Sequence, residues 1–551
     1  MRDVIVIGSG FGGAVMAARL SAALGTLKPG SKVLVLEKGP DSTGGHFDPR
    51  SQGDGALNAQ GNRFKHSLSP QYLSSIAQLH TDPVGAQTPG TPSMTVISGS
   101  GVGGGSQVYD GVSLRAPTEA FEQMREGRRL WPTLYSRSAL APYYSRVERR
   151  LNVVKPEWTD ANVPHWQLMT KRDFVFAEGC RRIGATAVGL KIADKNDANE
   201  GWWNEGQRFE GRQSLTKNYL LDAKQAGAEF RAGCTIESVE PTRDGYVVRG
   251  TDSRTFAAIE EECRLLIVAG GSMGSTGLLL KSRERFTGTR DVDPHQLLGR
   301  HVSGNGDYGV TGVVGPRFEL DVEGFKGKPM ASYCPSFFRE HQFILIPFYA
   351  APLSLALGQF STLLAPKNPL AVGRRSTEVA AGPDGKAERD WGLPYKQRLS
   401  QFGSRVLTMG CLALDACEGE IRLSANGQST EVTWRQTAPS TERRWNAAVT
   451  AMRSIYEALG GEMYLDGYRK EGTVHTAHPL GGAPMATQAE WGVVDQNAES
   501  FTNPNLFVVD SAMIPSALGA NPSLTIAAVA ESIADRLVRG VGMKSLRDRL
   551  L

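Results

Sequence analysis

The N-terminal segment begins with a short apolar run that is followed at once by glycines, and this pattern organises the predictions for the rest of the chain. Residues 4–7 are all apolar, glycines follow at positions 8, 10 and 13, and an alanine-rich amphipathic segment occupies residues 14–20. An apolar run rich in β-branched residues predicts a buried strand. The amphipathic segment predicts a helix, which a tight turn joins to the strand.

The spacing of these glycines is typical of a dinucleotide-binding βαβ unit. In such a unit Gly8 permits the turn, Gly10 lets the backbone approach a pyrophosphate, and Gly13 lets the helix pack against the strand. The phosphates then bind the free N–H groups at the start of the helix. A second apolar run, residues 33–36, ends on Glu37, where the ribose-binding carboxylate belongs. We expect cofactor contacts from Gly8, Gly10, Phe11, Gly12, Gly13 and Glu37.

Two more glycine-rich segments follow apolar residues later in the chain. Five of the seven residues from 99 to 105 are glycine, which is used where the backbone must approach another group or adopt unusual dihedral angles. Apolar residues bound this segment closely, which favours a loop that wraps a ligand over a flexible linker. Residues 265–275 repeat the order of strand, glycine turn and helix, so we expect the chain to return there to the first sheet.

The middle of the chain, from 308 to 458, has a different pattern. Apolar alternation on both sides of the Asn-Gly pair at 426–427 predicts a β-hairpin. A helical pattern over 441–459 ends at a glycine pair. We therefore expect an antiparallel sheet with helices, forming a substrate domain that is inserted into the nucleotide-binding one. Helical patterns also predict helices over 117–151.

Near the C-terminus, a strand pattern over residues 505–510 ends on Asp510. Asn521 then precedes Pro522 at the start of an amphipathic pattern that runs to Leu537. Asparagine is a favoured N-cap residue and proline a favoured first helical residue, so we expect a helix that Asn521 caps. The positive end of its dipole would point at whatever lies beyond the strand.

Composition limits the classes of function. The chain has 551 residues, enough for several domains, and its net charge of +4 comes from scattered lysines and arginines, which argues against a nucleic-acid partner. The six cysteines show neither a CxxC motif nor metal-ligand spacing, so we expect no metal site and reduced thiols. Because the first strand begins near residue 3, we expect no signal peptide and a cytoplasmic protein. A leader that is missing from this numbering is the alternative.

One segment tests whether the chain crosses a membrane. Residues 343–365 carry no charge over 23 positions, enough to span a bilayer, but Pro347, Pro352 and Gln359 interrupt them. We favour a buried strand and helix that form the wall of an apolar pocket over a transmembrane span. A lid that touches a membrane surface transiently is an alternative.

Taken together, these motifs resemble those of the glucose-methanol-choline (GMC) oxidoreductases, which bind FAD. The segments at 101–106, 477–482 and 519–528 are most similar to the cholesterol-oxidase-like branch, whereas the middle of the chain matches loosely. The resemblance implies an α/β fold, with a Rossmann-type FAD-binding domain like that of glutathione reductase and an inserted α+β substrate domain. We expect the FAD-binding domain at 1–150, 216–307 and 471–551, and the substrate domain at 151–215 and 308–470.

The resemblance also implies roles for single residues. His478 falls on the active-site histidine that accepts the substrate hydroxyl proton, and Asn521 falls on its partner. The chemistry needs such a pair, because hydride transfer from an alcohol carbon to flavin N5 also requires removal of the O–H proton, for which a neutral imidazole is suited. The other cofactor contacts that the resemblance implies are Gly101, Gly104, Gly105, Ser106, Tyr109, Gly270, Asp510, Ser511, Asn521 and Pro522.

Structural roles are the alternatives for the two central residues. His478 precedes Pro479, which restricts its backbone to extended conformations, so it could be a loop histidine that is hydrogen-bonded for structure alone. Asn521 could act only as a helix cap. One departure from the family matters as well: around 352–359 the apolar segment offers no counterpart of the glutamate found in sterol oxidases. This puts in doubt both cholesterol as substrate and double-bond isomerisation.

The expected activity is FAD-dependent oxidation of a secondary alcohol on a bulky, apolar, sterol-like molecule, with O2 or another electron acceptor reoxidising the flavin. One alternative keeps the fold and oxidises a polar polyol or a natural-product intermediate. A second alternative is a lyase of the hydroxynitrile type, which binds FAD but performs no net redox reaction.

Overall fold

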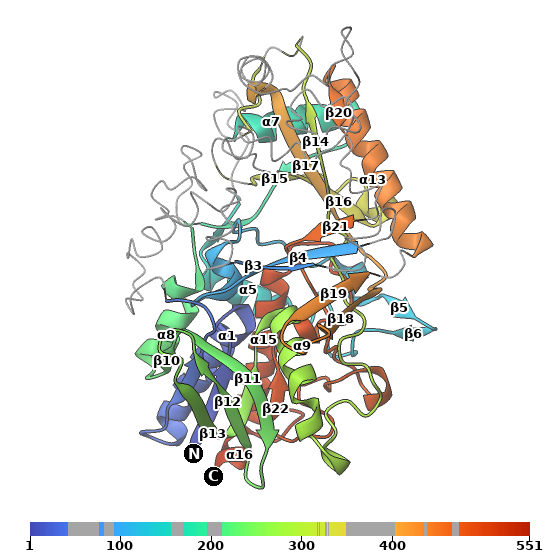
Figure 1. Ribbon diagram of the computed structural model, residues 1–551. Coiled ribbons are helices and arrows are strands. Elements are labelled where there is room, and N and C mark those ends of the chain that lie inside the picture. Colours follow the sequence, from blue (N-terminus) through green and yellow to red (C-terminus); the bar gives the residue numbers. More distant parts are fainter. Residues whose placement is uncertain are drawn as a thin grey trace.

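Figure 1 shows the computed structural model of the chain, in which two sheets and their helices lie one above the other. The N-terminal and C-terminal ends lie close together at the base of the lower part. The structure describes residues 1–41, 77–81, 93–155, 169–194, 212–316, 318, 320–324, 328, 330–348, 403–434, 438–464 and 473–551.

The predicted N-terminal unit is confirmed. β1 (Arg2–Ile7) leads into α1 (Phe11–Leu27), and β2 (Val33–Leu36) lies parallel beside β1. These strands belong to a seven-stranded sheet with the order β10-β2-β1-β13-β12-β11, in which β22 also pairs with β13. The pairs that involve β1, β2, β10 and β22 are parallel, whereas β11 and β12 are antiparallel. The other strands are β10 (Glu229–Arg231), β11 (Cys234–Pro241), β12 (Tyr246–Asp252), β13 (Ala258–Val268) and β22 (Leu506–Val508).

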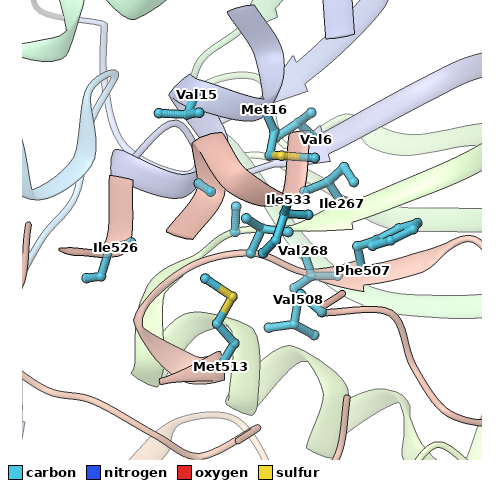
Figure 2. Close-up of a cluster of buried hydrophobic side chains, with 14 of the residues drawn as sticks. Val6, Val15, Met16, Ile267, Val268, Phe507, Val508, Met513, Ile526 and Ile533 are labelled. Atoms are coloured by element: carbon cyan, nitrogen blue, oxygen red, sulfur yellow. The ribbon is translucent and has the colours of Figure 1, made fainter. Parts of the chain in front are cut away.

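Helices pack around α1 and form the main core with the sheet. α1 contacts α8 (Tyr219–Gln225) and α15 (Ser523–Arg539), and α15 contacts α5 (Ala141–Arg150). Figure 2 shows how side chains from β1, α1, β13, β22 and α15 meet in this core. Burial of these apolar side chains is the main stabilising term for the domain. Residues drawn there and fully buried include Val6, Val15, Met16, Ile267, Val268, Phe507, Val508, Met513 and Ile533.

The predicted second glycine turn and the antiparallel middle sheet are also confirmed. α9 (Gly271–Ser282) follows β13 directly. The second sheet has the order β16-β17-β14-β20, and all its pairs are antiparallel. α13 (Pro439–Ala458) packs on it and contacts α7 (Lys171–Arg182). Its strands are β14 (Tyr308–Val313), β16 (Phe343–Phe348), β17 (Val406–Ala413) and β20 (Glu462–Tyr464).

Two smaller pieces of sheet lie between these layers (Figure 1). The hairpin predicted around the Asn-Gly pair forms β18 (Gly419–Leu423) and β19 (Thr430–Trp434). A three-stranded sheet joins β21 in parallel to β4 and β4 in antiparallel to β3. Its strands are β3 (Ala77–Thr81), β4 (Ser93–Gly99) and β21 (Thr473–Thr476).

Short α-helices and strands, besides several 3-10 helices, lie between or after these longer elements. The helices are α4 (Thr118–Phe121), α10 (Phe338–His341) and α16 (Leu546–Leu550). The strands are β5 (Met124–Arg125), β6 (Arg128–Arg129), β7 (Val153–Val154), β8 (Val188–Gly189), β9 (Ile192–Ala193) and β15 (Ser332–Tyr333).

The helical prediction over 117–151 is wrong in its centre. β5 and β6 pair as a short hairpin there. Glu126 and Gly127 have positive φ angles of 53° and 77°, as the tightest hairpin turns require, and such a turn interrupts a helix. Helices form only on either side of it, as α4 and α5.

The predicted cap of the last long helix is wrong as well. α15 begins at Ser523, Pro522 occupies the cap position, and no side chain caps the helix. Asn521 does not turn back to its own helix because its amide contacts another side chain, which the next section describes. In the uncharged segment, β16 confirms the predicted strand, and the rest of that segment lies outside the described residues. Among the helices of the described chain, none combines the length and apolarity needed to cross a membrane.

Candidate active site

The glycines after β1 form a tight cradle. Gly8 has a φ of +98°, and a Cβ atom there would lie 2.3 Å from the carbonyl oxygen of Ala269. At Gly12 a Cβ atom would lie 1.7 Å from the carbonyl oxygen of Val509. By contrast, no described heavy atom comes within 4 Å of the Cβ position of Gly10. The cradle is therefore closed on the sheet side and open at Gly10, where the backbone can approach a ligand.

The start of α1 is open to an anion. Gly10 occupies its N-cap position and no side chain caps the helix, so the first-turn N–H groups and the positive end of the helix dipole are available to a phosphate. The second glycine loop packs directly on this point: a Cβ atom at Gly104 would lie 2.7 Å from Cα of Gly10. The backbone N–H of Gly103 also donates to Oγ of Ser9 at 2.9 Å. Two segments that are far apart in sequence thus form one cradle.

Glu37 is buried at the edge of this cradle. One carboxylate oxygen accepts hydrogen bonds from the N–H and Oγ of Ser9 at 3.0 and 2.6 Å, and the other accepts from the N–H of Gly39 at 2.9 Å. Burial raises the pKa of Glu37, and these hydrogen bonds oppose the shift only in part. Glu37 follows β2 directly, and its carboxylate holds Ser9 of the first glycine turn and Gly39 in place.

Asp510 and Ser511 are joined to the start of α9. The carboxylate of Asp510 accepts hydrogen bonds from the N–H of Gly271 at 2.7 Å and from Oγ of Ser275, while Oγ of Ser511 accepts from the N–H of Ser272 at 2.8 Å. The N–H of Gly270 donates to Oγ of Ser275 at 2.8 Å. Burial raises the pKa of Asp510 to about 6. The structure thus brings the predicted residues Gly270, Asp510 and Ser511 together at the start of α9, where Asp510 is buried, Ser511 is half-buried and Gly270 is exposed.

Ser106 and Tyr109 join the glycine loop to two other segments of the chain. Oγ of Ser106 accepts a hydrogen bond from the N–H of Leu215 at 3.0 Å. The Tyr109 ring packs edge-on against Phe11, with ring centroids 5.5 Å apart, and its hydroxyl donates to the carbonyl of Gln213. Tyr109 therefore stands beside the first residue of α1.

His478 and Asn521 meet although they are 43 positions apart. Nε2 of His478 lies 3.1 Å from Nδ2 of Asn521. Nδ1 of His478 lies 2.9 and 2.8 Å from the two carboxylate oxygens of Asp307. A carboxylate only accepts hydrogen bonds, so Nδ1 carries the hydrogen, and in the neutral ring Nε2 accepts from the amide. The oxygen of that amide, Oδ1 of Asn521, is buried and has no partner among the described residues.

The environment of His478 favours a charged ring. Burial lowers its pKa, but Asp307 raises it through charge and through the hydrogen bond, and Asp110 adds to this, so the net shift is upward. The side chains of His478 and Asp307 are 21% and 12% exposed. Thr476 completes the group, because its Oγ1 donates to Asp307 at 2.8 Å and accepts from the N–H of His478 at 2.8 Å.

Asp307 is the residue that sequence reasoning missed. It closes the segment Gly304-Asn305-Gly306-Asp307 immediately before β14. The available signal was an Asn-Gly pair followed by an acid at the start of a strand. Asn305 contributes as well: its Nδ2 donates to the carbonyl of Ala520 at 2.8 Å, and its Oδ1 accepts from the N–H groups of Leu518 and Gly519 at 2.8 and 3.1 Å. One short turn therefore fixes both His478 and the segment that carries Asn521.

Comparison with protein families decides to which family this chain belongs. Residues 3–284 match the N-terminal domain of the GMC oxidoreductases, and residues 416–530 match the C-terminal domain of the same family. The chain belongs to the GMC oxidoreductase family. Members of this family are flavoproteins that act on CH–OH groups, so the predicted resemblance, fold class and enzyme class are confirmed.

Relatives of the family differ in the alcohol that they oxidise. A cholesterol oxidase of Mycobacterium tuberculosis (strain ATCC 25618 / H37Rv) is 26% identical over 97% of this chain and 90% of its own length. Long-chain-alcohol oxidase FAO4B of Arabidopsis thaliana is 24% identical over 98% of this chain and 68% of its own length. The solved structure of a pyridoxine 4-oxidase from "Mesorbium loti" superimposes with a TM-score of 0.64 at 13% identity, covering 98% of this chain and 99% of that one.

Proposed function

We propose that this protein is an FAD-dependent oxidase or dehydrogenase that oxidises a secondary hydroxyl group on a bulky, largely apolar molecule. The observation that carries this proposal is the pairing of half-buried His478 with buried Asn521, with Asp307 behind the imidazole. The names of the two curated relatives, a cholesterol oxidase and a long-chain-alcohol oxidase, support an apolar alcohol.

The residues present fit FAD. Gly10 is open to ligand, the N-terminus of α1 has no side-chain cap, and Glu37 lies beside this turn, where it would contact the ribose. Phosphates would bind at the start of α1, and the glycine loop around Gly104 would cover them. Oδ1 of Asn521 is a buried acceptor that lacks a partner in the described chain, as expected of a group that meets a cofactor or substrate donor.

When bound, FAD supplies the acceptor for the hydride that leaves the alcohol carbon. The residues of this chain supply the acid–base chemistry. His478 accepts the hydroxyl proton at Nε2, and the carboxylate of Asp307 stabilises the imidazolium that results. Asn521 donates to the substrate oxygen through Nδ2, which leaves the single hydroxyl hydrogen free to face Nε2 of His478. Water that entered the site would compete for both atoms, so the surrounding burial favours the reaction.

An apolar cluster beside the pair supports an apolar substrate. Ala520, the neighbour of Asn521, belongs to a buried cluster with Ile344 and Ile346 of β16. This is the strand that the sequence predicts as a pocket wall. The other members of the cluster are Val112, Leu114, Leu190, Ile192 and Leu412.

An anaerobic mixing experiment tests the proposal. The purified yellow protein is mixed with a panel of sterols, aliphatic alcohols and polyols, and the visible band of oxidised flavin is followed. Bleaching by sterols or long aliphatic alcohols supports the proposal. Bleaching by polyols alone keeps the enzyme class and contradicts the apolar substrate. If no alcohol bleaches the flavin while a cyanohydrin is cleaved, the lyase alternative replaces the oxidase.

A further inference from the structure

A pocket lined with arginines lies on the surface beside the β5–β6 hairpin, apart from the cradle and from His478. The space between its lining residues is about 400 Å³, a figure that includes the open solvent at its mouth. Arg125, Arg128 and Arg129 from the hairpin line it, together with His301 and Trp491. In Figure 1 this hairpin projects from the side of the lower part of the molecule. Apolar and small side chains such as Met485 form the rest of the wall.

The residues that line the pocket carry positive charge and no negative charge. Its described lining residues include three arginines and no aspartate or glutamate. Arg128 makes only a distant ion pair with Glu126, at 4.0 Å, and the Glu126 side chain is 81% exposed. Arg129 donates to the carbonyl oxygens of Phe121 and Tyr135, both at 2.7 Å, and carbonyl groups do not neutralise a guanidinium. An exposed ion pair such as that between Arg128 and Glu126 contributes little to stability in water.

Other side chains hold these cations in place. The guanidinium of Arg128 lies over the ring of Trp491, 4.8 Å from its centroid, which fixes its orientation while leaving its N–H groups free to donate. Arg125 lies 3.5 Å from the carbonyl oxygen of Ala416 and interacts electrostatically with Glu418. Arginine is suited to such a site because its planar fork matches the oxygen atoms of phosphate and carboxylate groups.

The charges of the arginines also act on His301. Burial, and then the charges of Arg125, Arg128 and Arg300, lower the pKa of His301 to about 4. Its imidazole is therefore neutral at physiological pH and can donate one hydrogen bond in the pocket. His301 adopts a left-handed backbone conformation with a φ of 60°. The neighbouring backbone holds this conformation, because Val302 pairs with Gly419 and Ser303 pairs with Leu480.

We propose that this pocket binds an oxyanion, a phosphate or carboxylate group, whose apolar body rests against the Met485 side of the wall. The arginines supply charge-assisted hydrogen bonds to the oxygens, and His301 supplies a neutral donor. The site does not depend on the proposed redox function, because it shares no residue with the cradle or with the His478 group.

Isothermal titration calorimetry of the purified, flavin-loaded protein at low ionic strength tests this site, with inorganic phosphate and hexanoate as separate probes. We expect saturable binding of at least one probe, and the two titrations distinguish a phosphate site from a carboxylate site. Arg128→Ala and Arg125→Ala should each weaken binding by roughly tenfold to a hundredfold. The matched control is Arg254→Ala, which removes an equal charge from an exposed turn between β12 and β13 and should leave binding unchanged.

A second readout separates a specific site from general charge attraction. In protein labelled at histidine, the pKa of His301, assigned through His301→Gln, should rise when the probe binds, because the anion offsets the arginine charges. Absence of saturable binding by both probes would overturn the proposal. Equal weakening in Arg254→Ala, or an unchanged pKa of His301 at saturation, would overturn it as well.

Discussion

Asp307 accepts a hydrogen bond from Nδ1 of His478 at 2.8 Å, so a carboxylate lies directly behind the imidazole that faces Asn521. This contact fixes the tautomer, because the ring nitrogen that faces Asn521 is then the one with a free lone pair. The carboxylate of Asp307 lies just before β14. It therefore comes from a different element than the glutamate of sterol oxidases, which lies in the apolar segment.

His478→Ala should abolish turnover while FAD stays bound. The imidazole contacts Asn521 and Asp307 and is not part of the glycine cradle, so its removal takes away the proton acceptor alone. We expect the rate of flavin bleaching by a good alcohol substrate to fall about a hundredfold to ten-thousandfold. Stopped-flow absorbance measures the rate, and the flavin-to-protein ratio is the control. Near-normal bleaching would contradict the assignment of His478 as base.

Asp307→Asn should keep the geometry and remove the charge. The asparagine oxygen can still accept from Nδ1, but without the carboxylate the imidazolium loses its main stabilising charge. We expect the bleaching rate to fall roughly a hundredfold, with normal flavin content. Asp321→Asn is a suitable control, because Asp321 is an exposed carboxylate whose hydrogen bond within the described part of the chain is with Ser404. Equal losses in both variants would assign Asp307 a general electrostatic role instead.

The pH dependence of the reaction should reflect the contact between Asp307 and His478. Asp307 and Asp110 raise the pKa of His478 against the effect of burial, and only the neutral ring can accept a proton. Activity should therefore rise as the pH increases through this raised pKa and stay high above it. In Asp307→Asn the pKa falls, so the rising limb should move to lower pH. The pH profile of kcat/KM measures both limbs, and identical profiles would exclude His478 as the titrating base.

Asn305→Ala should loosen the segment that presents Asn521. Asn305 is fully buried, and its removal leaves the N–H groups of Leu518 and Gly519 and the carbonyl of Ala520 without this partner. We expect the free energy of unfolding to fall by about 2–4 kcal/mol and the bleaching rate to fall with it. Asn305→Asp keeps the acceptor for both N–H groups and should recover part of both losses. Unfolding in denaturant and stopped-flow absorbance provide the two measurements.

Much of this architecture could be predicted because it follows from local patterns. Strand β1, the turn at Gly8 and helix α1 are dictated by adjacent residues, and so is the hairpin around residues 426–427. The contact between Asp307 and His478 joins positions 171 residues apart, and no local pattern reports such a pairing. The same reason explains the wrong cap: Asn521 has the local signature of an N-cap, but its amide is used by His478.

The glycine cradle offers a paired test of cofactor binding. The Cβ positions of Gly10 and Gly25 are both free of described heavy atoms within 4 Å, and neither residue has a positive φ. Both glycines can therefore be replaced by alanine without a clash inside the protein. Gly25 lies within α1, where alanine should stabilise the helix by about 0.5–1 kcal/mol and leave FAD binding unchanged.

Gly10→Ala should instead weaken FAD binding, because its methyl group would stand where the pyrophosphate approaches the backbone. The expected cost is about 1–3 kcal/mol, or roughly tenfold to a hundredfold in Kd. The stability of the flavin-free protein should not change. Flavin fluorescence titration of the flavin-free protein gives the Kd, and thermal unfolding of the same samples gives the stability. If Gly10→Ala and Gly25→Ala bind FAD equally well, the pyrophosphate does not lie at the start of α1, and the proposed cofactor site is wrong.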